Sequence, residues 1–264
     1  MTQAVERVTE VAIQQPQAQV QGSTEHLLTF QEYLAYEGEP DVLYELFRGK
    51  LIPMPAQSHL HTNICKFLIY KLQRYFAEKN LNLVANSLGT GVRTAENSSR
   101  IPDVVVCSQS VWAEVISRPG AGVLDFAEKP ILVVEIVSSN RRDDYVSKRY
   151  EYEMAEIPEY WIVDPQKKRV RVLANATNEE GYSWVDFSED SSIVSEQFDQ
   201  LNLSVQQLLN PPVVEQLIKE EQAKIKTLEQ EAETERQRAD NERQRAEKLA
   251  QRLREMGINP EEID

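Results

Sequence analysis

The chain of 264 residues is 41% hydrophobic and 27% charged, with a formal net charge of -14. This composition is that of one or two globular domains, and it excludes wholesale disorder and collagen-like structure. The acidic balance disfavours a protein that coats nucleic acid nonspecifically, so any contact with DNA or RNA must use a local basic patch.

The sequence contains no signal for a membrane or for export. No run approaches the roughly 18 consecutive apolar residues of a membrane-spanning helix, and the first twenty residues lack the apolar core of a signal peptide. Cys65 and Cys107 stand far apart without a CxxC motif, which indicates neither a disulfide framework nor a structural zinc site. We therefore expect a soluble protein of the reducing cytoplasm, without membrane partners.

The first part of the chain combines a polar leader with short helical and extended patterns. Residues 1–22 are rich in Gln and Val without a sustained period, which is typical of a flexible leader. Apolar side chains at helical spacing predict helices near 29–38 and over 59–79. Between them, two short apolar runs around Arg48-Gly49-Lys50 predict a hairpin over 42–54.

Extended patterns dominate the middle of the chain, interrupted by one polar helix predicted over 142–156. Strands are expected at 83–93, at IPDVVVCS (101–108), at PILVVEIVS (130–138), and at YWIVD, RVRVLA, GYSWVDF and SIVSE. Because helices separate these groups of strands, the predicted fold class is α/β or α+β around a mixed sheet.

Pro211-Pro212 mark a domain boundary, because the composition beyond them turns to Glu, Gln, Arg, Lys and Ala. We assign the globular domain to 23–210, a long helix to 211–256 and a short tail to 257–264. One heptad position of this helix holds Ile218, Ile225, Ala232, Ala239, Ala246 and Leu253. The companion position holds Val214, Leu228, Leu249 and Met256, but also Glu221, Glu235 and Glu242. A coiled coil that forms a homodimer and a solvated single helix with i,i+4 charge pairs both account for this pattern.

Two carboxylates interrupt otherwise apolar strands, Asp103 in IPDVVV and Glu135 in ILVVEIV. A buried carboxylate is costly without a partner, and one divalent cation compensates several carboxylates at once. Glu45 in YELF is a third candidate ligand, and the helix after Glu135 supplies a cation, Lys148. Magnesium-dependent phosphodiester hydrolysis requires such a set. Taken singly, however, acidic residues near strand ends more often face solvent or pair with an arginine.

Several separate motifs occur in order along residues 28–175: YELFRGKLIPMP, SxxHxxI (Ser58, His61, Ile64), IPDVVV, ILVVEIVSSN, DxxxKRxxYE and IPEYWIVDP. Together they resemble the Uma-type restriction endonuclease family, a branch of the PD-(D/E)XK nuclease superfamily. The resemblance implies a restriction-endonuclease-like core, a mixed sheet flanked by helices. Pro102-Asp103 would be the PD element and Glu135 the (D/E) position.

One position departs from the superfamily pattern, which places a lysine two residues after the second carboxylate. Here that residue is Val137, and Lys148 on the following helix resembles the displaced lysine of this family. The resemblance implies that Glu45, Asp103 and Glu135 bind Mg²⁺ or Mn²⁺ and that Lys148 positions the water. Tyr152 and His61 would have supporting roles. A lysine in the first turns of a polar helix is expected to be solvent-exposed.

Basic side chains near the proposed site, Arg141, Arg142 and Arg149, could contact a nucleic-acid backbone. The sequence thus predicts a magnesium-dependent endonuclease, acting on DNA in preference to RNA. Val137 and the acidic net charge also allow a protein that kept the nuclease fold without catalysis. Such a protein would bind nucleic acid or use its coiled coil to recruit a partner.

Overall fold

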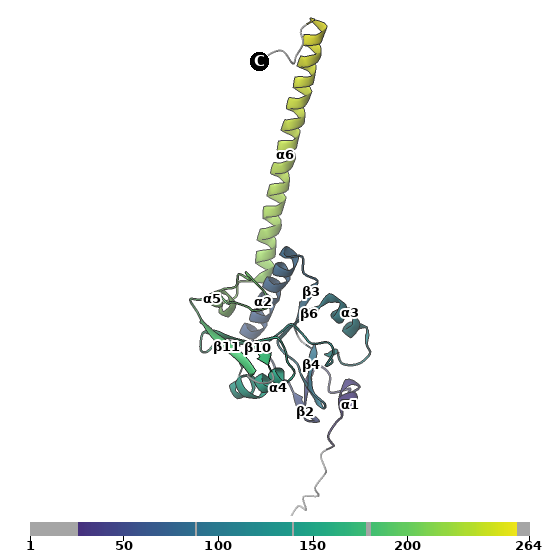
Figure 1. The fold of residues 1–264 in the computed structure, drawn as a ribbon, viewed down its shortest axis with the longest axis vertical. Helices are drawn as coiled ribbons and strands as arrows, with labels where there is room; N and C mark the ends of the chain where they lie inside the picture. Colours follow the sequence, from purple (N-terminus) through teal and green to yellow (C-terminus); the bar gives the residue numbers. More distant parts are fainter. Residues whose placement is uncertain (1–25, 88, 139, 178–180, 258–264) are drawn as a thin grey trace, which may run out of the picture.

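A computed structural model describes residues 26–87, 89–138, 140–177 and 181–257. The predicted leader 1–22 and nearly all of the predicted tail 257–264 lie outside these residues. Figure 1 shows a globular body from which one long helix projects at the side opposite the N-terminal end of the described chain. In the described parts of the chain, no helix is both long enough and apolar enough to cross a bilayer.

The larger sheet has six strands and both parallel and antiparallel pairs. Its order is β11 (Gly181–Ser188), β10 (Arg169–Thr177), β9 (Glu159–Asp164), β8 (Leu132–Ile136), β6 (Val104–Ser108) and β3 (Leu83–Asn86). β8 and β9 run parallel, whereas the other neighbours are antiparallel. Both faces of the central strands are buried, which explains their nearly continuous apolar sequences. The predicted mixed α/β class is confirmed.

The smaller sheet has five strands in the order β2 (Lys50–Pro53), β1 (Tyr44–Phe47), β5 (Ser98–Arg100), β4 (Gly91–Ala95) and β7 (Val123–Leu124). β1 and β2 form the predicted hairpin. Arg48 and Gly49 at its tip both have positive φ, 50° and 82°, as a two-residue turn between twisted strands requires. Neither β5 nor β7 was expected from the sequence.

Seven helical segments accompany the sheets in the described chain: α1 (Phe30–Leu34), α2 (His59–Glu78), α3 (Gln109–Ser117), η1 (Asp143–Lys148), α4 (Arg149–Met154), α5 (Val205–Leu209) and α6 (Val214–Glu255). The hydroxyl of Ser58 caps α2 by accepting a hydrogen bond from the His61 backbone. Phe67, Leu68 and Leu72 of α2 pack on one face of the larger sheet. Tyr152 of α4 lies against the opposite face, with its ring centroid 5.0 Å from that of Tyr160.

Three predicted elements differ in the structure. The strand expected at 83–93 is two strands, β3 and β4, which belong to different sheets. The helix predicted over 142–156 contains a π-helical segment, η1, over Asp143–Lys148, and α4 follows it from Arg149 to Met154. The SIVSE segment is not a strand and contributes only an isolated bridge from Ser192 to Ser204. Its polar groups are used elsewhere, because the Ser195 hydroxyl and the backbone N–H groups of the next two residues donate to the buried carboxylate of Glu159.

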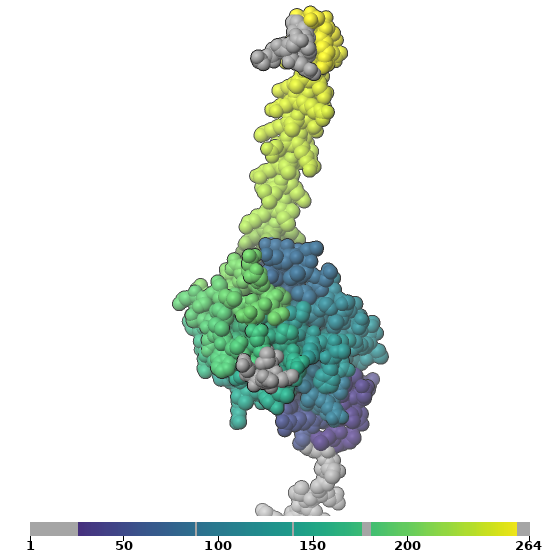
Figure 2. Space-filling view, in the orientation of Figure 1, coloured from purple at the N-terminus to yellow at the C-terminus, as the bar shows by residue number. Residues whose placement is uncertain are grey.

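α6 touches the body only at its first turns. Val214 and Leu217 are partly buried against the core, and Glu221 accepts a hydrogen bond from the hydroxyl of Tyr70 and pairs with Arg74. No described residue of α6 is fully buried, and the space-filling view shows the helix as a free rod beyond the body (Figure 2).

Candidate functional site

A cavity of about 420 Å³ opens beside the ends of β6 and β8. The chain before α2 and the first turn of α2 form one wall, and η1 forms another. Its charged and histidine side chains are those of His61, Asp103, Glu135, Asp144 and Lys148. Four of the residues predicted from the sequence therefore gather at one opening.

Asp103 and Glu135 lie on neighbouring segments of the chain, at the same face of the larger sheet. The antiparallel register pairs Val104 with Val134, so Asp103 and Glu135 are the next pair. They continue the face that carries Val105 and Val133.

The prediction that Asp103 lies within a strand is wrong by one residue, because β6 begins at Val104. Pro102 has no N–H to contribute to a ladder. The backbone N–H of Ile136 instead donates to Oδ2 of Asp103 at 2.7 Å. The side chain of Gln57 donates to Oδ1 at 3.1 Å. These contacts fix the carboxylate at the mouth of the cavity.

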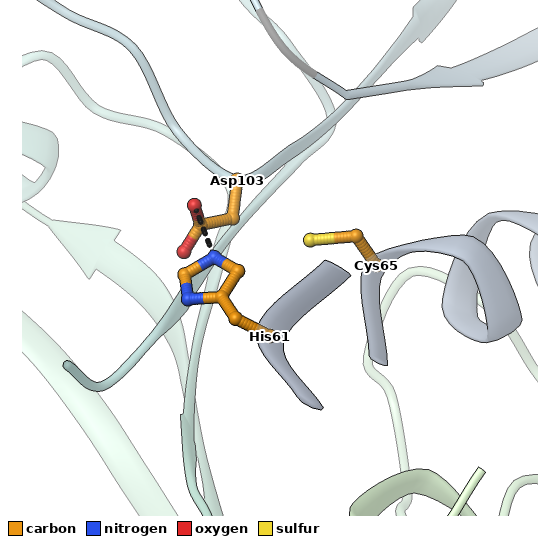
Figure 3. A group of neighbouring side chains, drawn as sticks. All are labelled: His61, Cys65 and Asp103. Atoms are coloured by element: carbon orange, nitrogen blue, oxygen red, sulfur yellow. Dashed lines mark ion pairs between the residues drawn. The ribbon is translucent and has the colours of Figure 1, made fainter. Parts of the chain in front are cut away.

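His61 reaches Asp103 from the first turn of α2. Its Nε2 atom lies 2.7 Å from Oδ1 of Asp103, but the pair lacks the geometry of a hydrogen bond, and Nε2 is buried without a hydrogen-bonding partner. Figure 3 shows the His61 ring and the Cys65 sulfur, one helical turn apart, both directed towards Asp103. Burial and the negative charges of Asp103 and Glu135 raise the pKa of the Cys65 thiol.

Lys148 is buried, with 8% of its surface exposed, and the expectation of an exposed lysine is wrong. Its Nζ lies 2.8 Å from Oε2 of Glu135 and 3.5 Å from Oε1 of Glu45. The π-helical turn places Asp144 and Lys148 together on the inner face of the segment, and their charged groups are 3.9 Å apart. Such wide turns are frequent at functional sites.

Tyr152 donates a hydrogen bond to Glu135, and Arg100 donates one to Glu45. The hydroxyl of Tyr152 donates to Oε1 of Glu135 at 2.8 Å. Nη1 of Arg100 donates to Oε2 of Glu45 at 2.8 Å, and the backbone N–H of Ile101 donates to Oε1 of Glu45 at 3.1 Å. Arg100 was not singled out from the sequence, because β5 itself was not predicted.

The electrostatics of the cluster follow from burial and from an excess of carboxylates. Burial raises the pKa of Glu135 well above its usual value, although Lys148 opposes this. For Lys148 itself, burial disfavours the charge, but Glu135, Glu45 and Asp144 outweigh burial and raise its pKa. Burial would also raise the pKa of Glu45, yet Lys148 and Arg100 lower it. Lys148 is therefore an ammonium ion and not a base at neutral pH.

Asp144 is an acidic residue of the site that was not predicted from the sequence. It lines the cavity and is nearly buried. Burial, reinforced by Asp103 and other carboxylates and opposed by Lys148, raises its pKa to about 7. The one sequence signal was its place one turn before Lys148, on the same face of the predicted helix.

The donor set fits a divalent cation. Buried carboxylates of Glu45, Asp103, Glu135 and Asp144 outnumber the nearby cations Lys148 and Arg100, and oxygen donors suit Mg²⁺. Among the described residues, however, the group whose ligand atoms all lie within 4.8 Å of one another is a different one, His61, Cys65 and Asp103. The sequence signal for this group was the His61-x-x-x-Cys65 spacing, which places both side chains on one face of a helix.

The three arginines predicted to contact nucleic acid have different surroundings. Arg141 pairs with the buried Asp164 beside the cavity rim. Arg149 lies near Glu153 and over the ring of Trp184. Arg142 is exposed to solvent.

Comparison of the chain with known proteins identifies its family. The Uma2 family model, described as "Putative restriction endonuclease", matches residues 30–206. A crystal structure of a putative nuclease belonging to DUF820 from Anabaena variabilis ATCC 29413 superposes with a TM-score of 0.54 and 21% sequence identity. The match covers 69% of this chain and 98% of that one, and it supports the fold alone. No curated protein matches the chain. Because the family model spans more than half of the sequence, the chain belongs to the Uma2 restriction endonuclease family.

Proposed function

We propose that the protein is a metal-dependent endonuclease that hydrolyses phosphodiester bonds of nucleic acid, with DNA as the preferred substrate. One observation carries the proposal. Asp103, directly before β6, and Glu135 of β8 continue the β6–β8 register side by side at an open cavity, and the ammonium group of Lys148 lies 2.8 Å from Glu135. Paired carboxylates can hold the metal of a phosphodiester hydrolysis, and a buried lysine can stabilise the charge that develops in its transition state.

Asp103 and Glu135 would hold Mg²⁺ or Mn²⁺, with Glu45 as a third ligand. When bound, such an ion activates a water and neutralises charge that develops on the phosphate. Lys148 would orient the attacking water and stabilise the negative charge of the transition state, since its own pKa is raised and it stays charged. Val137 occupies the position where the superfamily has lysine, and the buried side chain from η1 takes that place.

His61 and Tyr152 are positioning residues in this proposal. The Tyr152 hydroxyl fixes one oxygen of Glu135, which leaves the other oxygen directed at Lys148. His61 contacts Oδ1 of Asp103 and restrains its carboxylate at the cavity. Arg141, Arg142 and Arg149 follow the adjoining loop and helix, where they would contact the phosphates of a bound strand.

The test is nicking of supercoiled DNA, and cleavage of single-stranded DNA and RNA, with Mg²⁺ or Mn²⁺ and with chelator. Wild-type protein should cleave only with metal, and Asp103→Asn or Glu135→Gln should lose about 100-fold or more of the rate. Glu159→Gln is a matched control, because Glu159 is a buried carboxylate on the neighbouring strand β9 outside the cavity. A wild-type protein without metal-dependent cleavage would favour the non-catalytic nucleic-acid-binding or interaction module.

Two further proposals concern the oligomeric state of the protein and its location in the cell. The free rod of α6 supports a homodimer formed through the heptad positions of that helix. The two cysteines, Cys65 and Cys107, are both buried free thiols, which supports a location in the reducing cytoplasm.

A further inference from the structure

A second kind of metal site lies at the edge of the cavity. His61 and Cys65 stand one turn apart on α2 and converge with Asp103, so that an imidazole nitrogen, Sγ and a carboxylate oxygen all lie within 4.8 Å of one another. All three side chains are buried. Figure 3 shows them meeting from two elements, the helix and the chain that enters β6.

The donors differ in chemistry from those of the carboxylate site. A sulfur, an imidazole nitrogen and one carboxylate oxygen form a set that suits zinc, cobalt and other thiophilic ions, whereas Mg²⁺ takes oxygen ligands. We propose that His61, Cys65 and Asp103 bind a thiophilic divalent ion such as Zn²⁺, with a fourth position open to water in the cavity.

An independent observation supports the site. Nε2 of His61 is buried and lies 2.7 Å from Oδ1 of Asp103, yet it makes no hydrogen bond within the described structure, although buried polar atoms are nearly always satisfied. A bound metal ion would supply the partner that this nitrogen lacks. His61 and Asp103 also line the cavity, which gives an ion a path from solvent.

The geometry needs only a small adjustment. Ligand atoms on one tetrahedral zinc ion lie on the order of 3.3–3.6 Å apart, whereas Nε2 of His61 and Oδ1 of Asp103 are 2.7 Å apart. Insertion of the ion separates this pair by less than about 1 Å and draws Sγ of Cys65 inward. The thiol proton leaves to solvent, because only the thiolate binds metal.

Binding can be measured without any nuclease assay. Titration of the full-length protein with Co²⁺ should give the near-ultraviolet charge-transfer band of a thiolate ligand. Cys65→Ser and Cys65→Ala should abolish that band, and Cys107→Ser is the matched control, since Cys107 is the other buried free thiol and lies outside the cluster. Competition with a chromophoric chelator should show Zn²⁺ binding weakened more than about 100-fold by loss of Cys65 or His61, because even outer-shell changes cost 10–100-fold.

A wild-type protein that shows no thiolate band, or a Cys65→Ala variant that keeps it while circular dichroism shows a native fold, overturns the site. One consequence rests on the proposed nuclease. Because Asp103 belongs to both sites, Zn²⁺ should inhibit magnesium-dependent cleavage, and Cys65→Ala should be inhibited less. Absence of cleavage would bear on the nuclease alone, whereas the Co²⁺ spectrum tests the new site.

A second inference, independent of the first, concerns how α6 pairs with a second copy, and it rests on the proposed homodimer. The seam is uncovered, with Ile225 55% and Leu249 60% exposed. Residues 214–235 hold seven acidic and three basic side chains, a charge of -4, whereas 236–255 hold four acidic and seven basic, a charge of +3. The helix therefore has an acidic half and a basic half.

We infer that two α6 helices pair antiparallel. A parallel pair would place like-charged halves together and would stack Glu235 and Glu242 against their own copies in the seam. An antiparallel pair sets each acidic half beside a basic half and places these glutamates opposite the other heptad position, which is alanine or isoleucine. The glutamates that weaken a parallel coil thus specify orientation.

A spin label at Leu249→Cys distinguishes the arrangements, with wild-type protein as control because its two thiols are buried. Antiparallel pairing around the middle of α6 predicts a distance between labels on the order of 35–45 Å at 1.5 Å per residue. A distance near about 10 Å, the spacing of packed helices, would overturn the orientation. Absence of dipolar coupling in full-length protein would overturn the homodimer itself.

Discussion

At the scale of single residues, Lys148 shows how burial changes the meaning of a substitution. Its ammonium group contacts Glu135 and Glu45, so its removal leaves buried carboxylates without their cation. Breaking a buried ion pair typically costs about 3–5 kcal/mol. We expect Lys148→Met to lower the free energy of unfolding by that amount in urea denaturation, whereas Lys219→Met on the exposed face of α6 should change it by less than about 0.5 kcal/mol.

Glu135→Gln added to Lys148→Met should recover part of the stability, because it removes the uncompensated charge. If Lys148→Met alone is neutral, the buried pair does not exist. Any nuclease assay of Lys148 variants therefore needs a measurement of folded protein beside it.

Asp144 predicts a specific pH dependence of stability. Its folded pKa is raised to about 7 from 3.8, so the folded protein keeps a proton that the unfolded chain has lost. The contribution of this carboxyl is fully present below pH 3.8 and is lost as the pH rises towards 7.

Asp144→Asn removes this titration with little change of shape. The gain in unfolding free energy over wild type should be roughly 1–3 kcal/mol larger at about pH 8 than at about pH 5, at about 1.36 kcal/mol per pKa unit. Urea denaturation at both pH values measures it. If the difference in unfolding free energy between Asp144→Asn and wild type is the same at both pH values, the pKa of Asp144 is not raised.

Asp103 and Glu135 were predictable because each is an acidic residue in an otherwise apolar run of the sequence. Both lie at the cavity. Arg100 and Asp144 were not predictable in the same way. Arg100 belongs to a three-residue strand with no periodic signal, and the burial of Asp144 and Lys148 depends on a π-helical turn that side-chain periodicity does not reveal.

At the scale of elements, regular patterns were predicted better than polar segments. α2 and α6 fall within three residues of their expected bounds, because both have long helical repeats. The segment at 192–196 has the alternation of a strand but serves a buried acceptor, Glu159. The sequence does not reveal that the Glu159 carboxylate requires these hydrogen-bond donors, because they are required only once β9 is buried.

Removal of α6 tests whether this element controls assembly. A chain that ends at Gln222 keeps the contacts of Glu221 with Tyr70 and Arg74 and the packing of Val214 and Leu217. It loses nearly all of the exposed seam. Light scattering should show a dimer for the full chain and a monomer for the shortened one, with a similar thermal midpoint for both. Equal masses would place assembly on another surface.

At the scale of the whole molecule, the acidic net charge shapes how the protein can meet nucleic acid. Because the net charge is -14, we expect attraction to come from the few cations at the cavity rim. Of the three arginines, Arg141 is held by Asp164 and Arg149 lies near Glu153, so Arg142 is the most exposed contact. Only a small number of counterions should therefore be released on binding.

The salt dependence of binding follows from that number. We expect the Glu135→Gln variant to bind a DNA duplex without cleaving it. The logarithm of its affinity should fall against the logarithm of salt with a slope of about -1 to -3, near -0.9 per phosphate contacted. Arg142→Glu should weaken binding and make the slope shallower by about one, whereas Lys219→Glu on the distant helix should leave it unchanged. Fluorescence anisotropy measures both quantities. A slope as steep as about -6 would require a basic surface elsewhere, and an unchanged slope in Arg142→Glu would remove this arginine from the interface.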